Sequence, residues 1–218
     1  MRHEPERWAL YTGVVAVILW IVGIFVVESG SIPDENATDA DYLAYYQDDA
    51  NRILSGSWIF MVGCLAFLVF AVVLWNRLAA AEGGSRMFSN VALIGAVATG
   101  VLAMLSAGPD VAAAIQEDDL SAAAAGSMQV LGDAFFVGAE LSAILLMLGA
   151  GMVALRTGIF PKAWAWFSFF LALVLVIGPI GWAGLIFGLP VWVLGTTFFL
   201  VRRSAPAAGA EPVAPLGA

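Results

Sequence analysis

Long uninterrupted apolar runs limit this chain more than any other feature of its sequence. Six runs approach the roughly 20 residues that a helix needs to cross the hydrocarbon of a bilayer: residues 8–27, 54–75, 90–107, 127–155, 162–177 and 182–201. Hydrophobic residues make up 61% of the 218 positions, and charged residues only 12%. A membrane β-barrel would need segments of about ten residues that alternate apolar and polar side chains. The sequence therefore predicts an all-α, polytopic membrane protein with six transmembrane helices.

The segment between the first two runs is polar and acidic, and it carries a helix signature of its own. Thr38, followed three residues later by Asp41, resembles a capping box, and apolar positions then recur at helical spacing: Tyr42, Tyr46, Ala50 and Ile53. This pattern predicts a short amphipathic helix over residues 39–53 that lies on the membrane surface. Its tyrosines would face the lipid or the bundle, or act as ordinary aromatic anchors at the interface. We expect one domain over residues 1–203 and a disordered tail over residues 204–218.

The basic residues are sorted by side of the membrane. Of the nine Lys and Arg residues, all but Arg52 fall on the side of the N-terminus: Arg2, Arg7, Arg77, Arg86, Arg156, Lys162, Arg202 and Arg203. Cytoplasmic loops of membrane proteins carry an excess of Lys and Arg. The sequence therefore predicts that both termini lie in the cytoplasm and that the acidic loops face outward.

The fourth run is unusual because it contains two carboxyl groups, Asp133 and Glu140. Positions seven apart on a helix return to within about 20° of each other, so both groups share one face. An ionisable group at membrane depth costs about 2.5 to 3.5 kcal/mol, so we expect this face to point into the bundle, with Glu140 near mid-membrane. Two interpretations of Glu140 stay open. It is either a protonated structural carboxyl, bonded to a hydroxyl such as Thr99 or Ser142, or a proton-exchanging or amine-binding group in an outward cavity.

Arg52 is expected just before the second span, at the outer face, where Asp110 and Asp133 also lie. We expect an interhelical ion pair between Arg52 and one or both of these acids, beneath the tyrosine helix. The alternative is a pair with Asp48, one turn earlier on the same helix. The candidate ligand- or proton-binding set is therefore Glu140, Asp133, Arg52, Asp110 and Tyr46.

Histidine and cysteine usage excludes several kinds of chemistry. The single histidine, His3, lies in the N-terminal tail, and Cys64 is alone inside an apolar run. Histidine-ligated haem or zinc, catalysis by a histidine base and a disulfide framework therefore have no side chains to use. Phosphate-binding glycine loops and nucleic-acid surfaces are also missing. We expect no cofactor, no metal, no nucleic-acid partner and no catalytic residue, and an enzyme is the least favoured class.

Two classes of function remain open. The first is the binding of a small molecule or lipid in an outward-facing cavity, with proton-coupled transport as one form of it. The alternative is a non-catalytic membrane subunit or scaffold, which docks a membrane protein partner or a second copy through small-residue faces. Such faces occur on the third span, at Ala92, Ala96 and Gly100, and on the fourth, at Ala134, Gly138 and Ser142.

A family resemblance agrees with this architecture. The string YYQDDANRILSG at residues 45–56 is followed by a glycine-aspartate pair in the fourth span and by a closing span with Trp-x-x-Leu and a basic end. In these features, over most of residues 8–203, the chain resembles uncharacterised six-span integral membrane proteins of actinobacteria. The resemblance implies a bacterial plasma membrane protein with a six-helix fold, and it implies no particular activity.

Overall fold

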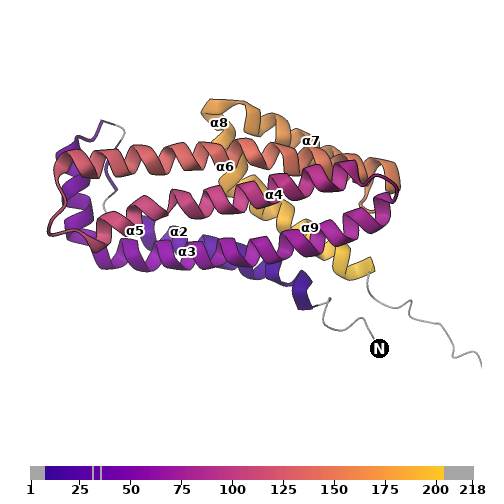
Figure 1. The fold of residues 1–218 in the computed structure, drawn as a ribbon, viewed down its shortest axis with the longest axis horizontal. Coiled ribbons are helices and arrows are strands. Elements are labelled where there is room, and N and C mark those ends of the chain that lie inside the picture. Colours follow the sequence, from indigo (N-terminus) through magenta and orange to yellow (C-terminus); the bar gives the residue numbers. More distant parts are fainter. Residues whose placement is uncertain (1–7, 31, 35, 204–218) are drawn as a thin grey trace, which may run out of the picture.

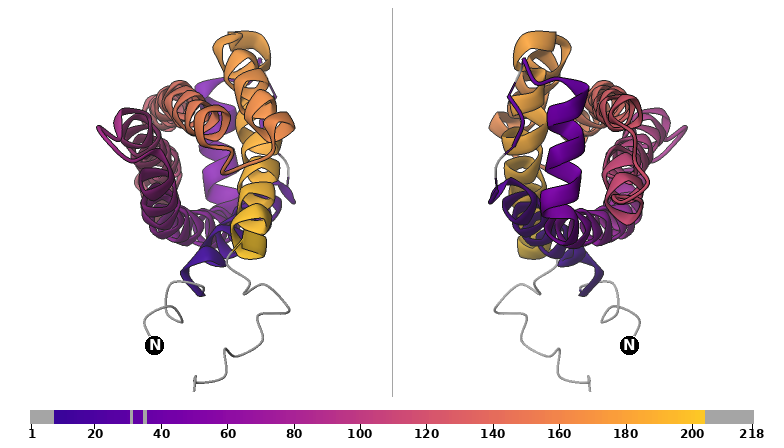
Figure 2. Two further views of the ribbon diagram at one scale, coloured as in Figure 1. Left: turned by 90° about the vertical axis from the view of Figure 1, so that its right-hand side faces the viewer. Right: turned by 90° about the vertical axis from the view of Figure 1, so that its left-hand side faces the viewer.

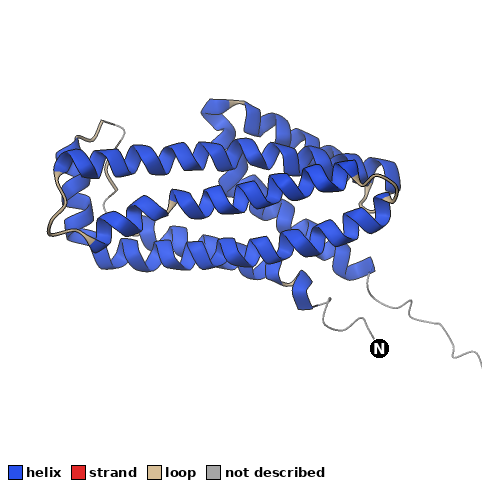
Figure 3. Ribbon diagram, in the orientation of Figure 1, coloured by secondary structure: helices blue, strands red, loops and turns tan. Residues whose placement is uncertain are grey.

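The computed structural model describes residues 8–30, 32–34 and 36–203, and helices joined by short loops form almost all of this part (Figure 3). Five of its helices are long and apolar enough to cross a membrane: Trp8–Glu28, Asp39–Glu82, Met87–Ile115, Ala122–Thr157 and Gly178–Arg203. A further apolar helix, Lys162–Val176, has 15 residues and is about 22 Å long at 1.5 Å per residue. The predicted all-α membrane class is confirmed. The predicted tail at 204–218 lies outside the described residues.

The helices run mostly along the long axis of the molecule (Figure 1). They are α2 (Thr12–Glu28), α3 (Asp39–Glu82), α4 (Met87–Ser106), α5 (Gly108–Ile115), α6 (Ala122–Thr157), α7 (Lys162–Val176), α8 (Gly178–Ala183), the π-helical η1 (Gly184–Gly188) and α9 (Leu189–Arg203). The first described helix begins and α9 ends at one end of the bundle, which also holds the loops at 83–86 and 158–161. The start of α3 and the loop between α5 and α6 lie at the opposite end.

The predicted surface helix and the second span are one continuous helix, so the prediction of a separate helix at 39–53 was wrong. The capping box at its start is confirmed, because Thr38 accepts from the Asp41 N–H and Asp41 Oδ2 accepts from the Thr38 N–H at 2.7 Å. Residues 39–54 contain no glycine or proline, so nothing ends the helix before the apolar run begins. With 44 residues, α3 is about 66 Å long. It is about twice as long as the hydrocarbon of a bilayer is thick.

The tyrosine face of α3 packs against other helices rather than against lipid. Tyr46, Ala50 and Ile53 form a buried cluster with three alanines of the neighbouring helices: Ala113 and Ala114 of α5, and Ala125 of α6. We call these six residues the end cluster, because they lie at the end of the bundle away from the described termini (Figure 1). The predicted helical spacing is confirmed, but its apolar face belongs to a protein core.

Helices α4 and α6 cross with almost no side chain between them. A Cβ atom at Gly95 would lie 2.3 Å from the backbone nitrogen of Leu146, and one at Gly149 would lie 2.6 Å from that of Ala92. Ala92 and Ala96 are buried in the same core. The small-residue face of the third span is therefore occupied within this chain, as close helix contact requires. It is not an exposed docking surface.

The C-terminal helices form a hairpin that lies along one side of the bundle (Figure 2). The chain reverses at Ile177, and Pro179 then stands in the first turn of α8, where a missing N–H costs nothing. The helix starts at Gly178, four residues before the predicted start of the sixth span. The π-helical segment η1 directly precedes Leu189-Pro190, where proline removes a backbone donor. Trp192 of α9 donates from Nε1 to Ser168 of α7 at 2.8 Å, which holds the two arms together.

Candidate functional site

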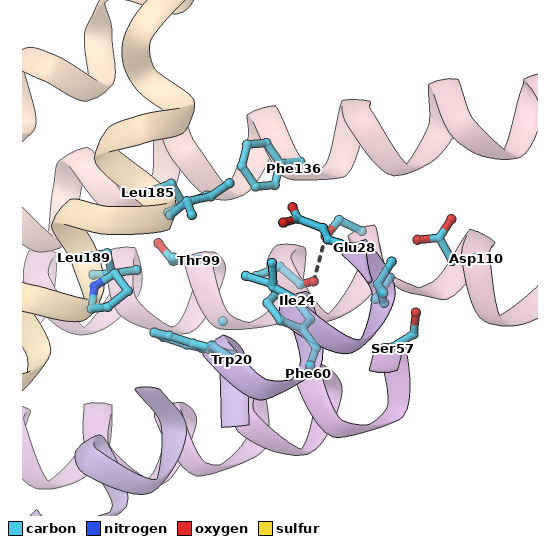
Figure 4. Close-up of a pocket in the computed structure, with 18 residues that line it drawn as sticks. Trp20, Ile24, Glu28, Ser57, Phe60, Thr99, Asp110, Phe136, Leu185 and Leu189 are labelled. Carbon is cyan, nitrogen blue, oxygen red and sulfur yellow. Dashed lines mark hydrogen bonds between the residues drawn. The ribbon is translucent and has the colours of Figure 1, made fainter. Parts of the chain in front are cut away.

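A cavity of about 210 Å³ lies between α2, α3, α4, α6 and the η1–α9 segment. Its walls are mostly apolar and include large side chains from five elements: Trp20, Ile24, Phe60, Phe136, Leu185 and Leu189 (Figure 4). Sites for small organic ligands typically combine such walls with a few polar groups that fix the orientation of the ligand.

Beside the cavity, α2 and α3 approach each other closely. A Cβ atom at Gly23 would lie 2.7 Å from the backbone nitrogen of Phe60, and one at Gly56 would lie 2.6 Å from the Val27 side chain. Only glycine allows this approach, which places Glu28 at the last turn of α2 next to α3. The glycines are visible in the sequence, and they are the signal that could have indicated the crossing.

The polar groups of the cavity gather toward one side. Figure 4 shows Asp110, Glu28 and Ser57 on that side, and Leu185, Leu189 and Thr99 toward the other. The predicted set contained Asp110 from this group, but sequence reasoning missed Glu28 and Ser57. In the sequence, Glu28 indicates only the end of the first span, and a single serine in an apolar helix gives no signal of its own.

Asp110 is held in place by Tyr46. The Tyr46 side chain is 0% exposed, and its hydroxyl donates to Oδ1 of Asp110 at 2.8 Å. Asp110 lies in the first turn of α5, which begins with Gly108 and Pro109. A carboxylate can accept about four hydrogen bonds. Asp110 therefore keeps acceptor capacity for a ligand after it binds Tyr46.

Two buried polar groups at the cavity lack an oxygen or nitrogen partner among the described residues. The Ser57 side chain is 2% exposed, and its hydroxyl, which can both donate and accept, makes no hydrogen bond with residues 8–30, 32–34 or 36–203. The indole N–H of Trp20, a residue 6% exposed, has no such acceptor either, and its neighbour is the thiol of Cys64, a weak acceptor. Buried polar groups normally find partners, so unpaired polar groups at a cavity indicate room for a ligand.

Arg52 does not pair as predicted. Its Nε lies 3.0 Å from Asp49 Oδ1 and its Nη2 lies 2.5 Å from Asp49 Oδ2, while Nη1 donates to the carbonyl of Val27. The predicted pairs with Asp110 or Asp133, and the alternative pair with Asp48, were therefore wrong. Asp49 lies three residues earlier on the same helical face, within easy reach. The Val27 carbonyl is one of the acceptors left open at the end of α2, where a cation is favourable.

The two carboxyls of α6 do not share one environment, as the sequence had suggested. Glu140 is 5% exposed and lies against Gly181 of α8, where an added Cβ would approach its Oε1 to 1.7 Å. Asp133 is exposed, and its Oδ1 accepts from Gln129 on the same helix at 3.2 Å. The prediction that Asp133 and Glu140 share a face inside the bundle was therefore wrong for Asp133. Helix α8 covers α6 at Glu140, whereas Asp133 lies about 10 Å farther along the helix.

The hydroxyls expected to bind Glu140 bind backbone carbonyls of their own helices instead. Thr99 donates to Gly95 at 2.8 Å, and Ser142 donates to Gly138 at 2.8 Å. Within the described part of the chain, nothing donates a hydrogen bond to the Glu140 carboxyl. Among the same residues, no group of three His, Cys, Asp or Glu side chains is arranged to hold a metal ion.

Compared with known proteins, the chain matches no family model, no curated protein and no solved structure. The assignment of a function therefore depends on the cavity, the side chains that line it and the position of both in the bundle. Of the predicted site residues, Asp110 lines the cavity, and Tyr46 holds the Asp110 carboxylate in place. Arg52, Asp133 and Glu140 do not line the cavity.

Proposed function

We propose that this chain is a six-span protein of a bacterial plasma membrane, with both termini in the cytoplasm, that binds a small molecule or lipid in a cavity open to the outside. The sequence resemblance and the distribution of basic residues support the location and orientation. The cavity supports the binding function, and it is the observation on which the proposal depends.

Helix lengths support six spans and give the depth of the membrane. Arg156 lies near the cytoplasmic end of α6, and Glu140 precedes it by 16 residues (156 − 140), about 24 Å along the helix. Asp133 precedes Arg156 by 23 residues (156 − 133), about 34 Å. If the hydrocarbon begins near Arg156 and is about 30 Å thick, it would end between Glu140 and Asp133. Asp133 would meet water, and the α7–α8 reversal beside Glu140 would lie near the outer surface, so α7 serves as the fifth span.

With the membrane at this level, the proposed binding cavity lies in its outer half. Phe136 lines it from α6, one turn beyond Glu140, and Asp110 lines it from α5, close to the end cluster. A ligand could enter from the outer solution at this level without crossing the hydrocarbon. A volume of about 210 Å³ suits a small organic molecule or the end of an acyl chain.

Glu140 is the candidate for proton exchange if binding is coupled to transport. Of the helices that contact α6, α4, α7, α8 and η1 carry one charged side chain, Lys162 at the far end of α7, whereas α3 carries several charged residues and α5 carries Asp110. Gly181, which touches Glu140, lies one turn before Leu185 of the cavity wall. A change in the charge of Glu140 would therefore act first on the segment that also contacts the ligand.

A thermal-shift measurement tests the binding function. The protein in lipid nanodiscs is screened with small amphiphiles, and a ligand at 100 times its dissociation constant should stabilise it by about 2.7 kcal/mol. Ala103 lines the cavity, so Ala103→Phe should fill it and abolish the shift. Val97→Phe, on the exposed face of the same helix, should keep the shift. A ligand that stabilises all three proteins equally would place binding elsewhere and contradict the proposal.

A further inference from the structure

We propose that the cavity selects a primary ammonium carried on a short apolar body, with Glu28, Asp110 and Ser57 as the groups that bind the charged head. This inference rests on the proposed function, since it names the chemical class of the ligand for the same cavity. It follows from three observations: the charge of the lining, the free acceptor capacity of Asp110, and the unpaired hydroxyl of Ser57.

The charge of the cavity is negative. Its lining contains the two acids Glu28 and Asp110, and none of its described residues is Lys, Arg or His. Arg52 lies one helical turn or so from Ser57 on α3, but its guanidinium is taken up by Asp49 and the carbonyl of Val27. An anionic ligand would meet two carboxylates with no cation to offset them. A cation would be attracted, and more strongly here than in open water, because part of the solvent is excluded.

Asp110 offers an oxygen in a fixed position. Tyr46 binds Oδ1, and Oδ2 makes no hydrogen bond with the residues that the structure describes. The carboxyl is only partly exposed, so it cannot rely on bulk water alone. A ligand N–H directed at Oδ2 would form a charge-assisted hydrogen bond, which is stronger than a neutral one.

Ser57 adds the third group and the strongest indication of a ligand. Its side chain is more than nine-tenths buried and unpaired, and Figure 4 shows its hydroxyl oxygen on the side of the cavity where Asp110 lies. An ammonium group has three N–H donors, and two carboxylates and one hydroxyl match that number. A quaternary ammonium or an alcohol would leave at least one of these oxygens without a partner.

The apolar walls determine the rest of the ligand. Phe60 and Phe136 lie between the acids and the far side of the cavity, which Trp20, Leu185 and Leu189 line. These side chains offer contact area and no hydrogen-bonding group other than the Trp20 indole. The body of the ligand is therefore apolar and short.

Cysteine modification tests the charge preference. The reporter is Ser106→Cys in a Cys64→Ala background, because Ser106 lines the cavity and Cys64 is a buried free thiol. Cells are treated with a cationic trimethylammonium-ethyl methanethiosulfonate or with its anionic sulfonatoethyl counterpart, and the ratio of the two rates is measured. Replacing both acids, with Glu28→Gln and Asp110→Asn, should lower the cation-to-anion ratio by about tenfold or more. Asp48→Asn, an exposed acid of the same end of α3, should leave the ratio unchanged.

Protection by small probes tests the rest of the proposal. Hexylammonium should slow modification of the Ser106→Cys variant, and hexanesulfonate and 1-hexanol should not. Ser57→Ala should weaken the protection by hexylammonium several-fold, and Asp48→Asn should leave this protection unchanged.

The outcomes separate the two proposals. If neither reagent reaches the Ser106→Cys variant, the cavity is not open to the outside, and the proposed function fails together with this inference. If both reagents react but the acids do not change the ratio, or if hexanesulfonate protects as well as hexylammonium, the open cavity stands and the ammonium preference is overturned.

Discussion

The hydroxyl of Tyr46 on α3 donates to Oδ1 of Asp110 on α5 over 2.8 Å, and this hydrogen bond joins the end cluster to the wall of the cavity. Tyr46 is part of the core outside the expected membrane, whereas Asp110 lines the candidate site. Packing at the end of the bundle therefore positions a carboxylate that a ligand would meet.

Tyr46→Phe should lower stability measurably, because the ring still fills its place but Asp110 loses its donor. A hydrogen bond to a charged partner contributes about 1.5 to 3 kcal/mol. Thermal unfolding in detergent or nanodiscs measures the change. Tyr42→Phe is the matched control, since the half-buried Tyr42 side chain makes no hydrogen bond within the described structure. Equal midpoints for the two variants would contradict the role given to Tyr46.

Gly181→Ala should destabilise the protein because its methyl group would overlap the Glu140 carboxyl. Overpacking of this kind typically costs about 1 to 3 kcal/mol. Truncation of Glu140 to alanine should remove part of the clash. The double variant should therefore lose less stability than the sum of the losses of the two single variants. Gly178→Ala, where an added Cβ has nothing within 4 Å, is the control. Strictly additive losses would show that Gly181 and Glu140 are not in contact.

Gly149→Ala should disrupt the crossing of α4 and α6. The added Cβ would lie 2.6 Å from backbone atoms of Ala92 and Phe88, and backbone cannot move aside without shifting a whole helix. The fraction of monodisperse protein in size-exclusion chromatography should fall strongly. Gly138→Ala should lower this fraction only slightly, because its Cβ would meet the flexible Leu102 side chain at 3.2 Å. Similar profiles for the two variants would mean that the helices do not approach as closely as described.

Arg52→Gln should destabilise the link between α2 and α3, because the Val27 carbonyl and Asp49 both lose a charged partner. Breaking such a partly buried pair is expected to cost about 1 kcal/mol or more. Asp133→Asn should stay within about 0.5 kcal/mol of wild type, since an exposed side chain away from special features tolerates substitution. Chemical or thermal unfolding compares the two. A larger loss for Asp133→Asn would favour the buried acid face inferred from the sequence.

The parts of the fold that depend on local signals could be predicted from the sequence. The apolar runs gave the membrane class, and Thr38 with Asp41 gave the start of α3. The continuity of the surface helix with the second span is also local, but the change from polar to apolar composition at Leu54 hides it, because such a change resembles a boundary between two helices. A helix needs no such boundary when neither glycine nor proline interrupts it.

The site could be predicted only in part, because it depends on contacts between distant segments. Asp110 was identified from its position at the end of a span, but Glu28 and Ser57 meet it only because α2 crosses α3 at Gly23 and Gly56. Asp133 and Glu140 share a helical face by geometry, yet only Glu140 lies beneath α8. Periodicity indicates which residues face the same way and does not indicate where the neighbouring helix ends.

In the proposed arrangement, the cavity opens to the outside of a membrane whose cytoplasmic surface lies at the 158–161 loop. The most direct test compares two single-cysteine variants in the Cys64→Ala background, Ser106→Cys in the cavity and Lys162→Cys at the start of α7, in intact cells. An impermeant thiol reagent added outside should modify the Ser106→Cys variant at once and the Lys162→Cys variant only after the membrane is permeabilised. An unreactive Ser106→Cys variant, or a Lys162→Cys variant that reacts in intact cells, would contradict the account.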